Sequence, residues 1–299
     1  MLKTSSIQTA INNISNYVVG NEQRIKLALA TILSEGSILI EDAPGSGKTT
    51  FAKATAFSLG LDFKRIQFTG DLLPSDILGF NIIEENQTRF NPGPIFGNLI
   101  LADELNRASP KTQSAFMECM EEKAVTIDGK RYELPRPFFV LATQNPSDFS
   151  GTSLLPESQL DRFMVSFNMS PLSIEEERAI LENQKNIQIQ STQSHYVFEQ
   201  DQEAVLQIKN NHVTLDYIQN ISSFIKNGNF EFQLSTRCLI YLTNLSKAWA
   251  YVNGRDFVSP KDVQEILPYV LRHRIQHNSK YQTEAFIQNE IVKKVQVPY

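Results

Sequence analysis

The stretch SILIEDAPGSGKTT, residues 37–50, decides how the rest of the chain can fold. Its first five residues, 37–41, form a short apolar run typical of a buried strand, and residues 43–50 lead into a helix that we predict to begin near Thr49. Small residues let backbone N–H groups turn inward around phosphate oxygens, Lys48 adds a positive charge, and the Thr49 hydroxyl can hold Mg²⁺. The helix N-terminus adds a favourable dipole. The stretch therefore predicts a phosphate-binding P-loop.

This loop departs at one position from the full pattern G-x-x-x-x-G-K-[ST]. Asp42 stands where the pattern has its first glycine. Because Asp tolerates turn conformations better than most residues, we interpret the change as a local variant. The alternative is a glycine turn with an incidental lysine, and the strand before the loop and the helix after it disfavour that interpretation.

Further apolar segments continue the strand pattern beyond the loop. They are residues 63–68, 98–103, 138–143 and 164–169. Helical patterns separate several of them, as in residues 109–122, where Ser109 is the expected N-cap and Pro110 takes the first helical position. Apolar strands that alternate with helices predict a parallel sheet covered on both faces. The sequence thus predicts an α/β fold, with an αβα core around a five-stranded parallel sheet.

Two segments interrupt this alternation. Residues 80–91 and 124–134 have the pattern of β-hairpins. In the second, Asp128 and Gly129 give a tight-turn signal between alternating apolar residues. Both segments lie between elements of the core, so we predict that they are insertions rather than strands of the main sheet.

The chain changes character after residue 171. Ser173 and Glu176 form a capping box for a helix that runs to about residue 185, and helical patterns dominate from residue 200 onward. We therefore predict two domains, a core over residues 1–170 and an all-helical domain over residues 171–299. The aromatic residues that we assign to the core of the helical domain are Trp249 and Phe257.

Polar residues follow two of the predicted strands at their C-terminal ends, where open parallel sheets bind ligands. Asp103 ends the segment 98–103 and Glu104 follows it directly, and Asn145 comes after the segment 138–143. Asp103 can support Mg²⁺, Glu104 can orient or deprotonate an attacking water, and Asn145 can reach the γ-phosphate or that water. The alternatives are a solvated strand end for the carboxylates and a turn-forming asparagine before Pro146.

Composition bounds the class of protein. The chain has 299 residues, 41% of them hydrophobic and 20% charged, and a net charge of −5, which argues mildly against a nucleic-acid partner. Its two cysteines, Cys119 and Cys238, have no metal-ligand spacing and suggest a reducing compartment. No stretch approaches about 18 consecutive apolar residues. We expect a cytoplasmic protein without membrane insertion.

Several long motifs resemble the MoxR family of AAA+ ATPases. They are DLLPSDILGF (71–80), NPGPIFGNLILADELNRASPKTQSAFMECMEE (91–122), LPRPFFVLATQNP (134–146), LLPESQLDRF (154–163), VNGRDFVSPKDV (252–263) and VLRHRI (270–275). The resemblance covers nearly the whole chain. It implies an AAA+ core followed by an all-helical lid domain, with ATP and Mg²⁺ as cofactors.

The resemblance also assigns nucleotide-binding roles. The matching residues are Val18, Val19 and Gly20, which would pack on the adenine, and Pro44, Gly45, Ser46, Gly47, Lys48, Thr49 and Thr50 of the P-loop. Thr49 and Asp103 would hold Mg²⁺, partly through water. Glu104 would be catalytic, together with Asn145 at the sensor position of the fourth strand.

Arginines are the remaining catalytic candidates. Arg162, in LDRF, matches the arginine finger that reaches a neighbouring subunit's ATP, and Arg237, in LSTR, matches the lid arginine. Thr236 precedes Arg237 where the family usually has proline. Arg107, in DELNRA, is the alternative finger, and a surface cation is the alternative interpretation of Arg162. The two predicted hairpins correspond to inserts that in AAA+ relatives often face the pore or the client.

The function implied by the resemblance is ATP hydrolysis coupled to chaperone-like remodelling, maturation or activation of a client protein, in some members one with a von Willebrand factor A domain. A homo-oligomeric ring, expected to be a hexamer, is also implied. Two alternatives stay open. One is a nucleic-acid-processing motor related to helicases, and the other is a nucleotide-gated scaffold with very slow turnover.

A basic segment near the C-terminus allows one more interpretation. His273 and His277 lie four residues apart on a predicted helix, with Arg272 and Arg274 beside the first of them. The spacing fits a pair of metal ligands, but no third ligand is apparent. We therefore interpret the segment as a solvated basic face.

Overall fold

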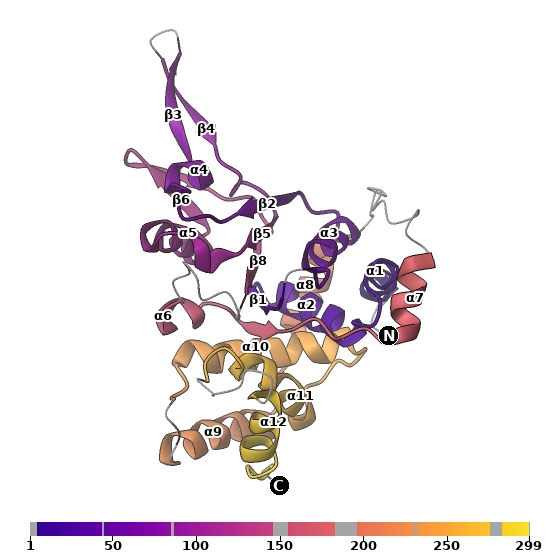
Figure 1. The fold of residues 1–299 in the computed structure, drawn as a ribbon. Coiled ribbons are helices and arrows are strands. Elements are labelled where there is room, and N and C mark those ends of the chain that lie inside the picture. Colours follow the sequence, from indigo (N-terminus) through magenta and orange to yellow (C-terminus); the bar gives the residue numbers. More distant parts are fainter. Residues whose placement is uncertain are drawn as a thin grey trace.

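The computed structural model describes residues 5–43, 45–84, 87–145, 155–182, 196–228, 230, 232–275 and 283–298. A central sheet has helices on both sides, two hairpins project from one end, and a group of helices lies at the opposite end (Figure 1). In the described residues, no helix combines the length and apolar character needed to cross a membrane.

The described main sheet is five-stranded and parallel, as predicted. Its strands are β1 (Ile38–Glu41), β2 (Phe63–Gln67), β5 (Leu99–Asp103), β8 (Phe139–Gln144) and β9 (Val165–Phe167). The strand order is β2-β5-β8-β1-β9, which differs from the order of the strands in the chain. Crossover connections therefore join the parallel strands. This order places the C-terminal end of β1 beside that of β8, and the C-terminal end of β2 beside that of β5.

Each face of the sheet packs into its own hydrophobic cluster. Leu99 and Leu101 belong to one cluster, whereas Ile100 and Ala102 belong to the other. The side chains of a strand point alternately to opposite faces, so both faces of β5 are buried. This arrangement explains why the strand segments are continuous apolar runs rather than alternating patterns.

Helices cover the two faces of the sheet. On one side lie α1 (Ser5–Ser15), α2 (Glu22–Leu33) and α3 (Lys48–Ser58), and on the other lies α5 (Pro110–Glu122) (Figure 1). The short helices are α4 (Pro74–Leu78), the 3₁₀ turn η1 (Leu105–Arg107) and α6 (Glu157–Leu160). As predicted, Ser109 caps α5, because its hydroxyl accepts a hydrogen bond from the Thr112 N–H at 3.3 Å.

Both predicted hairpins are present, and they touch one another. They are β3 (Gly79–Glu84) with β4 (Gln87–Pro92), and β6 (Ala124–Ile127) with β7 (Lys130–Glu133). Asp128 and Gly129 have positive φ angles of 49° and 78°, as the tight turn requires. The Phe90 and Tyr132 rings stack with centroids 4.0 Å apart. The two insertions therefore form one projecting unit.

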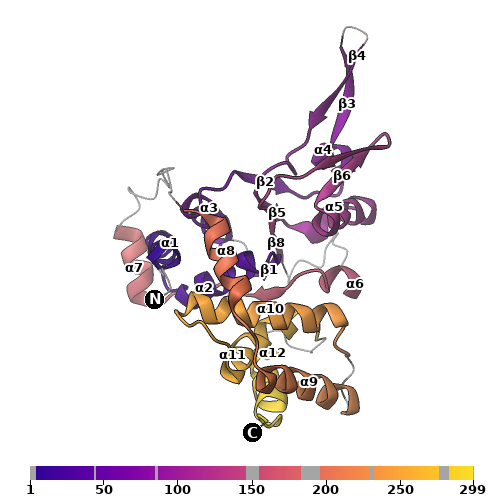
Figure 2. The same cartoon turned by 180° about the vertical axis from the view of Figure 1, so that it is seen from behind.

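The described residues after 171 are mostly helical. Their helices are α7 (Ile174–Glu182), α8 (Phe198–Gln207), α9 (His212–Asn227), α10 (Thr236–Val252), α11 (Pro260–Leu271), α12 (Thr283–Ile287) and a π-helical turn η4 (Gln288–Val292). The Ser173–Glu176 capping box is confirmed by reciprocal hydrogen bonds of 2.7 and 3.2 Å. Helix α7 lies beside α1, away from α9–α12, in both views (Figures 1 and 2).

One hydrophobic cluster extends from the sheet side into the C-terminal helices. It contains Ile25 and Leu29 of α2 together with Leu245 and Trp249 of α10. The division into domains at residue 170 stays a prediction. The interpretation of Phe257 as a core residue is wrong, because 57% of its surface is exposed, whereas Trp249 is buried as expected.

The interpretation of the basic segment as a solvated face is also wrong. Arg272 and His273 are buried at the junction between the C-terminal helices and the sheet, and the side chain of Arg274 is only 6% exposed. Carboxylates from distant parts of the chain make this possible, since Arg272 lies 3.6 Å from Glu41 and Arg274 pairs with Asp161 at 2.9 Å. Glu284, nearer in the chain, also pairs with Arg272 at 2.7 Å. The described residues contain no group of three or more side chains suited to a metal ion, and His277 lies outside them.

Candidate functional site

A pocket of about 410 Å³ lies at the C-terminal ends of the central strands. It is lined by Gly45, Gly47, Lys48, Thr49, Thr50, Arg65, Gln67, Asp103, Glu104, Thr143, Gln144 and Asn145. The crossovers in the sheet bring together the glycine loop, the paired carboxylates and the polar end of β8, which the sequence shows as three separate motifs. A ligand pocket is expected at this edge of an open parallel sheet.

The glycine loop has the backbone shape that the sequence pattern implies. Gly45 and Gly47 have φ angles of 84° and 86°, in the left-handed region that favours glycine. Apart from the adjacent residues in the chain, no described atom lies within 4 Å of a Cβ placed at either position, so the backbone angle rather than crowding requires glycine there. Pro44 lies outside the described residues.

Lys48 reaches back over this loop. Its Nζ donates hydrogen bonds to the carbonyl oxygens of Asp42 and Ala43 at 2.9 and 2.7 Å. Burial lowers the pKa of the Lys48 ammonium, and the nearby negative charges of Asp42, Asp103 and Glu104 oppose that shift. The ammonium is thus held at the mouth of the loop, where an anionic ligand would be its natural partner.

The backbone of Asp42 explains how the loop tolerates the missing first glycine. Its φ angle is not positive, so the position does not need glycine. The Asp42 side chain accepts hydrogen bonds from the N–H groups of Ala43 at 2.8 Å and Met169 at 3.2 Å. The carboxylate therefore fixes the start of the loop to the segment after β9.

The paired carboxylates at the end of β5 are held by side chains of neighbouring strands. The Thr143 hydroxyl donates to Asp103 Oδ1 at 2.7 Å and accepts from the Glu104 N–H at 2.9 Å. Arg65 Nη2 pairs with Asp103 Oδ2 at 2.6 Å. Glu104 has φ 55° and ψ 46°, an uncommon left-handed conformation for a residue with a Cβ. Such an outlier is frequent at functional sites.

Glu104 Oε2 has two donors in the same chain. Gln67 Nε2 lies 2.9 Å away and Arg107 Nη1 lies 3.0 Å away. Arg65, Gln67 and Thr143 were missed by the sequence analysis. The rule that polar strand ends line ligand sites, applied to the segment 63–68 as it was to 98–103, would have identified Gln67. Arg65 lies in the middle of that strand, so the rule would not have found it.

The residues of this pocket fit a nucleotide with a divalent cation. The Thr49 hydroxyl and the Asp103 carboxylate line it together, and Mg²⁺ prefers oxygen ligands of these kinds. Ser46 Oγ is buried without a hydrogen-bond partner among the described residues. The volume lies within the range of small-molecule sites, about 300–1,000 Å³.

Val18, Val19 and Gly20 do not line this pocket. They follow α1, and the Asn21 side chain donates to the Val19 carbonyl at 3.0 Å while accepting from the Ser170 N–H at 2.8 Å. A Cβ at Gly20 would lie 2.6 Å from Glu176 Oε1 of α7. The segment is therefore packed against the chain that leads into the C-terminal helices.

Arg162 and Arg237 lie in a second, smaller cavity of about 150 Å³. Its lining residues are Glu35, Ser37, Met120, Glu121, Lys123, Arg162, Arg237 and Tyr241. Among the described residues, none lines both this cavity and the first pocket. The two arginines, which come from separate motifs, are thus side by side but away from the P-loop of their own chain.

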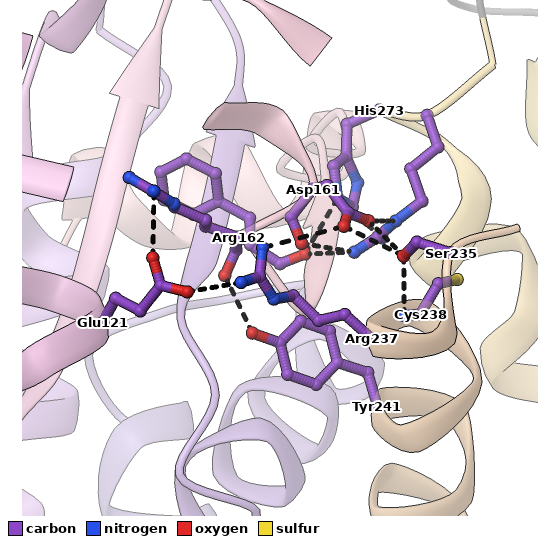
Figure 3. A network of polar contacts seen from close by, with 10 residues as sticks. Glu121, Asp161, Arg162, Ser235, Arg237, Cys238, Tyr241 and His273 are labelled. Carbon is purple, nitrogen blue, oxygen red and sulfur yellow. Dashed lines mark hydrogen bonds and ion pairs between the residues drawn. The ribbon is translucent and has the colours of Figure 1, made fainter. Parts of the chain in front are cut away.

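A set of polar contacts joins the LDRF segment to the first turn of α10 (Figure 3). Asp161 Oδ2 accepts from the Ser235 hydroxyl at 2.9 Å, and Ser235 caps α10 by accepting from the Cys238 N–H at 3.0 Å. Arg274 Nε pairs with Asp161 Oδ1 at 2.9 Å. Because Arg162 follows Asp161 and Arg237 lies in the first turn of α10, these contacts bring the two arginines together.

Comparisons with known proteins agree with this arrangement. Residues 37–165 match the family described as "ATPase family associated with various cellular activities (AAA)", and residues 223–295 match the AAA lid domain. A crystal structure of a Cytophaga hutchinsonii protein superposes with a TM-score of 0.86 and 34% identity, covering 99% of this chain and 96% of that one.

Curated relatives extend over most of the chain. The uncharacterized protein YeaC of Bacillus subtilis is 41% identical over 97% of this chain and 94% of its own length. Chaperone MoxR1 of Mycobacterium tuberculosis is 36% identical over 90% of this chain and 75% of its own length. Protein MoxR of Methylorubrum extorquens is 24% identical over 88% of this chain and 85% of its own length.

Proposed function

The chain belongs to the MoxR family of AAA+ ATPases, and we propose that it hydrolyses ATP at a site completed by a neighbouring copy of itself. The energy of hydrolysis would serve to remodel or activate a client protein. One observation carries the shared-site proposal: Arg162 and Arg237 line a cavity separate from the pocket that contains Lys48. Since these guanidinium groups do not line the nucleotide pocket of their own chain, we infer that they act on the nucleotide of another subunit.

Within the pocket, the residues divide between binding and hydrolysis. Lys48 would bind the β- and γ-phosphates, as it is the ammonium held at the mouth of the loop. Thr49 and Asp103 would hold Mg²⁺, which when bound offsets negative charge on the phosphate oxygens. Glu104 would orient or deprotonate the attacking water, with Asn145 beside it in the lining of the same pocket.

The neighbour's contribution would be positive charge. In the transition state, charge develops on the γ-phosphoryl oxygens, and an arginine supplied by a second subunit can stabilise it. In other P-loop enzymes such a finger raises the rate by about 10³–10⁵. Arg107 fits this role less well than Arg162 does, because Arg107 donates a hydrogen bond to Glu104 of its own chain.

A head-to-tail interface of this kind, repeated with closure, makes a ring. We propose a hexameric ring that lies in the cytoplasm and acts on a client protein. The name of the chaperone relative supports the action on a client. The kind of client that we favour is a protein with a von Willebrand factor A domain. The projecting hairpins, which among their described residues contribute nothing to the lining of the nucleotide pocket, would contact that client.

Mixed rings test the shared site. We expect Arg162→Ala to fold and bind ATP but to hydrolyse it poorly, and Lys48→Ala to be inactive. In rings assembled from equal amounts of both variants, an intact P-loop meets an intact Arg162 at about a quarter of the interfaces, if subunits mix at random. Steady-state ATPase should then recover toward that fraction.

Assembly is measured first by size-exclusion chromatography with light scattering, because loss of Arg162 can weaken the ring. Verified mixed rings that remain inactive contradict the shared site and make Arg107 the better candidate. ATPase activity stimulated by nucleic acid would instead favour the helicase-like alternative.

A further inference from the structure

Glu121 is a residue to which the sequence motifs assign no role. It lies in the last turn of α5, and dashed lines join its carboxylate to both guanidinium groups (Figure 3). Glu121 Oε2 pairs with Arg162 Nη2 at 2.9 Å, and Glu121 Oε1 accepts from Arg237 Nη2. One carboxylate thus contacts an arginine from the segment before β9 and another from the start of α10.

The physical effect of this bridge is on position rather than on overall stability. All three side chains are partly exposed, and a single ion pair of that kind contributes little. Two guanidinium groups side by side repel one another, however, and a carboxylate between them offsets that repulsion. In addition, a single ordered carboxylate fixes the positions of both guanidinium groups. Each guanidinium has five N–H donors, and the contact with Glu121 uses one nitrogen of each.

We propose that Glu121 is a positioning residue, which holds Arg162 and Arg237 as a pair so that their remaining N–H groups can bind the nucleotide of the neighbouring subunit. The inference rests on the shared site proposed above. On this proposal, Glu121 affects hydrolysis of the ATP bound by the neighbouring subunit and not of the ATP bound by its own chain.

The attachment of the C-terminal helices does not depend on Glu121. Ser235 and Arg274 both contact Asp161, and the Tyr241 hydroxyl donates to the Arg162 carbonyl at 3.3 Å. A substitution of Glu121 therefore removes the contact between the two guanidinium groups while these anchors remain. This separation allows the positioning role to be tested in a folded protein.

The first test compares Glu121→Gln with Glu122→Gln in rings of a single variant. Glu122 is the adjacent residue of α5 and pairs with Arg131 of the β6–β7 hairpin at 3.5 Å, so the control removes the same charge from the same helix end. Since misplacement of a catalytic group can cost about 10²-fold, we expect Glu121→Gln to lower kcat by roughly 10- to 100-fold with KM for ATP nearly unchanged. Glu122→Gln should leave both constants unchanged.

The second test places Glu121→Gln in one partner of the mixed rings. When Glu121→Gln is combined with Lys48→Ala, the substitution lies in the subunit that supplies the arginines. The ATPase activity recovered by the mixed rings should then fall by at least the factor seen in the first test. Combined with Arg162→Ala, it lies in the subunit that supplies the P-loop, and the recovered ATPase should stay at the level of the parent mixture.

Equal activity of the two arrangements, or unchanged kcat in the first test, overturns the positioning role. Failure of the parent mixture of Lys48→Ala and Arg162→Ala to recover activity is a separate result. It overturns the shared site and, with it, the role of Glu121. Normal ring assembly of each mixture is confirmed before ATPase activity is measured.

Discussion

At the scale of single residues, Lys48 and Glu104 line the same pocket but have different chemistry. We expect Lys48→Ala to weaken ATP binding by about 10- to 100-fold, because a hydrogen bond to a charged group contributes about 1.5–3 kcal/mol. Glu104→Gln should bind ATP normally and stall before hydrolysis, because an amide cannot accept the proton of water. Calorimetry with a non-hydrolysable analogue measures binding, and phosphate release measures hydrolysis.

A matched control for Lys48→Ala is Lys53→Ala. Lys53 lies on the same helix, α3, but is exposed and does not line the pocket. The Lys53→Ala variant should bind and hydrolyse ATP as the unmodified protein does. Normal ATP affinity in Lys48→Ala would sink the assignment of the P-loop.

At the scale of elements, the two hairpins form a unit separate from the nucleotide pocket. Ile83 of β3 is 79% exposed, although it is a large apolar residue. We expect replacement of Ile82 and Ile83 by serine, or of Lys130 and Arg131 by alanine, to keep basal ATPase within about twofold, as is usual for surface changes. Client-dependent activity should fall, because the exposed contact surface is lost.

The measurements are basal turnover and the amount of client that copurifies with Glu104→Gln rings, with and without the hairpin changes. Retained basal turnover together with reduced client capture is the expected pattern. If basal turnover collapses while the ring still forms, the hairpins belong to the catalytic machinery.

At the scale of the whole molecule, a buried ion pair joins the sheet to the C-terminal helices. Arg272 Nε and Glu41 Oε2 are 3.6 Å apart, and the two side chains are only 4% and 3% exposed. Further partners include Glu284 and Asn168 for Arg272, and Gln144 and Ser166 for Glu41. Because Glu41 ends β1 and Gln144 lines the nucleotide pocket, this network connects the pocket to the helical region.

Removing one member of the pair should be costly. We expect Arg272→Met to lower the free energy of unfolding by about 3–5 kcal/mol, because it leaves the buried Glu41 carboxylate without its guanidinium. Addition of Glu41→Gln should restore much of the loss, since neither buried charge then remains. Urea denaturation followed by circular dichroism measures both changes.

Arg178→Met is the control for this prediction. Arg178 pairs with Glu182 on α7, and both side chains are well exposed. Its substitution should change the free energy of unfolding by less than about 1 kcal/mol. A stability of Arg272→Met equal to that of the control would show that the buried pair does not hold the two parts together.

The sequence by itself determined the features that depend on residues close together in the chain. The strand, glycine loop and helix at residues 37–50 follow from apolar runs and small residues, and the strands, hairpins and helix caps follow from periodicity and turn chemistry. The carboxylates at the end of β5 could be assigned to the pocket because parallel strands end at a common edge.

Only the tertiary structure decided which distant residues meet. Arg237 contacts Glu121, 116 positions away in the chain, and Arg274 contacts Asp161, 113 positions away. Local patterns carry no information on such pairs, so the basic segment at Arg272 was interpreted as solvated. Its burial depends on Glu41, because a charge leaves water only where a partner from elsewhere in the fold compensates for lost hydration.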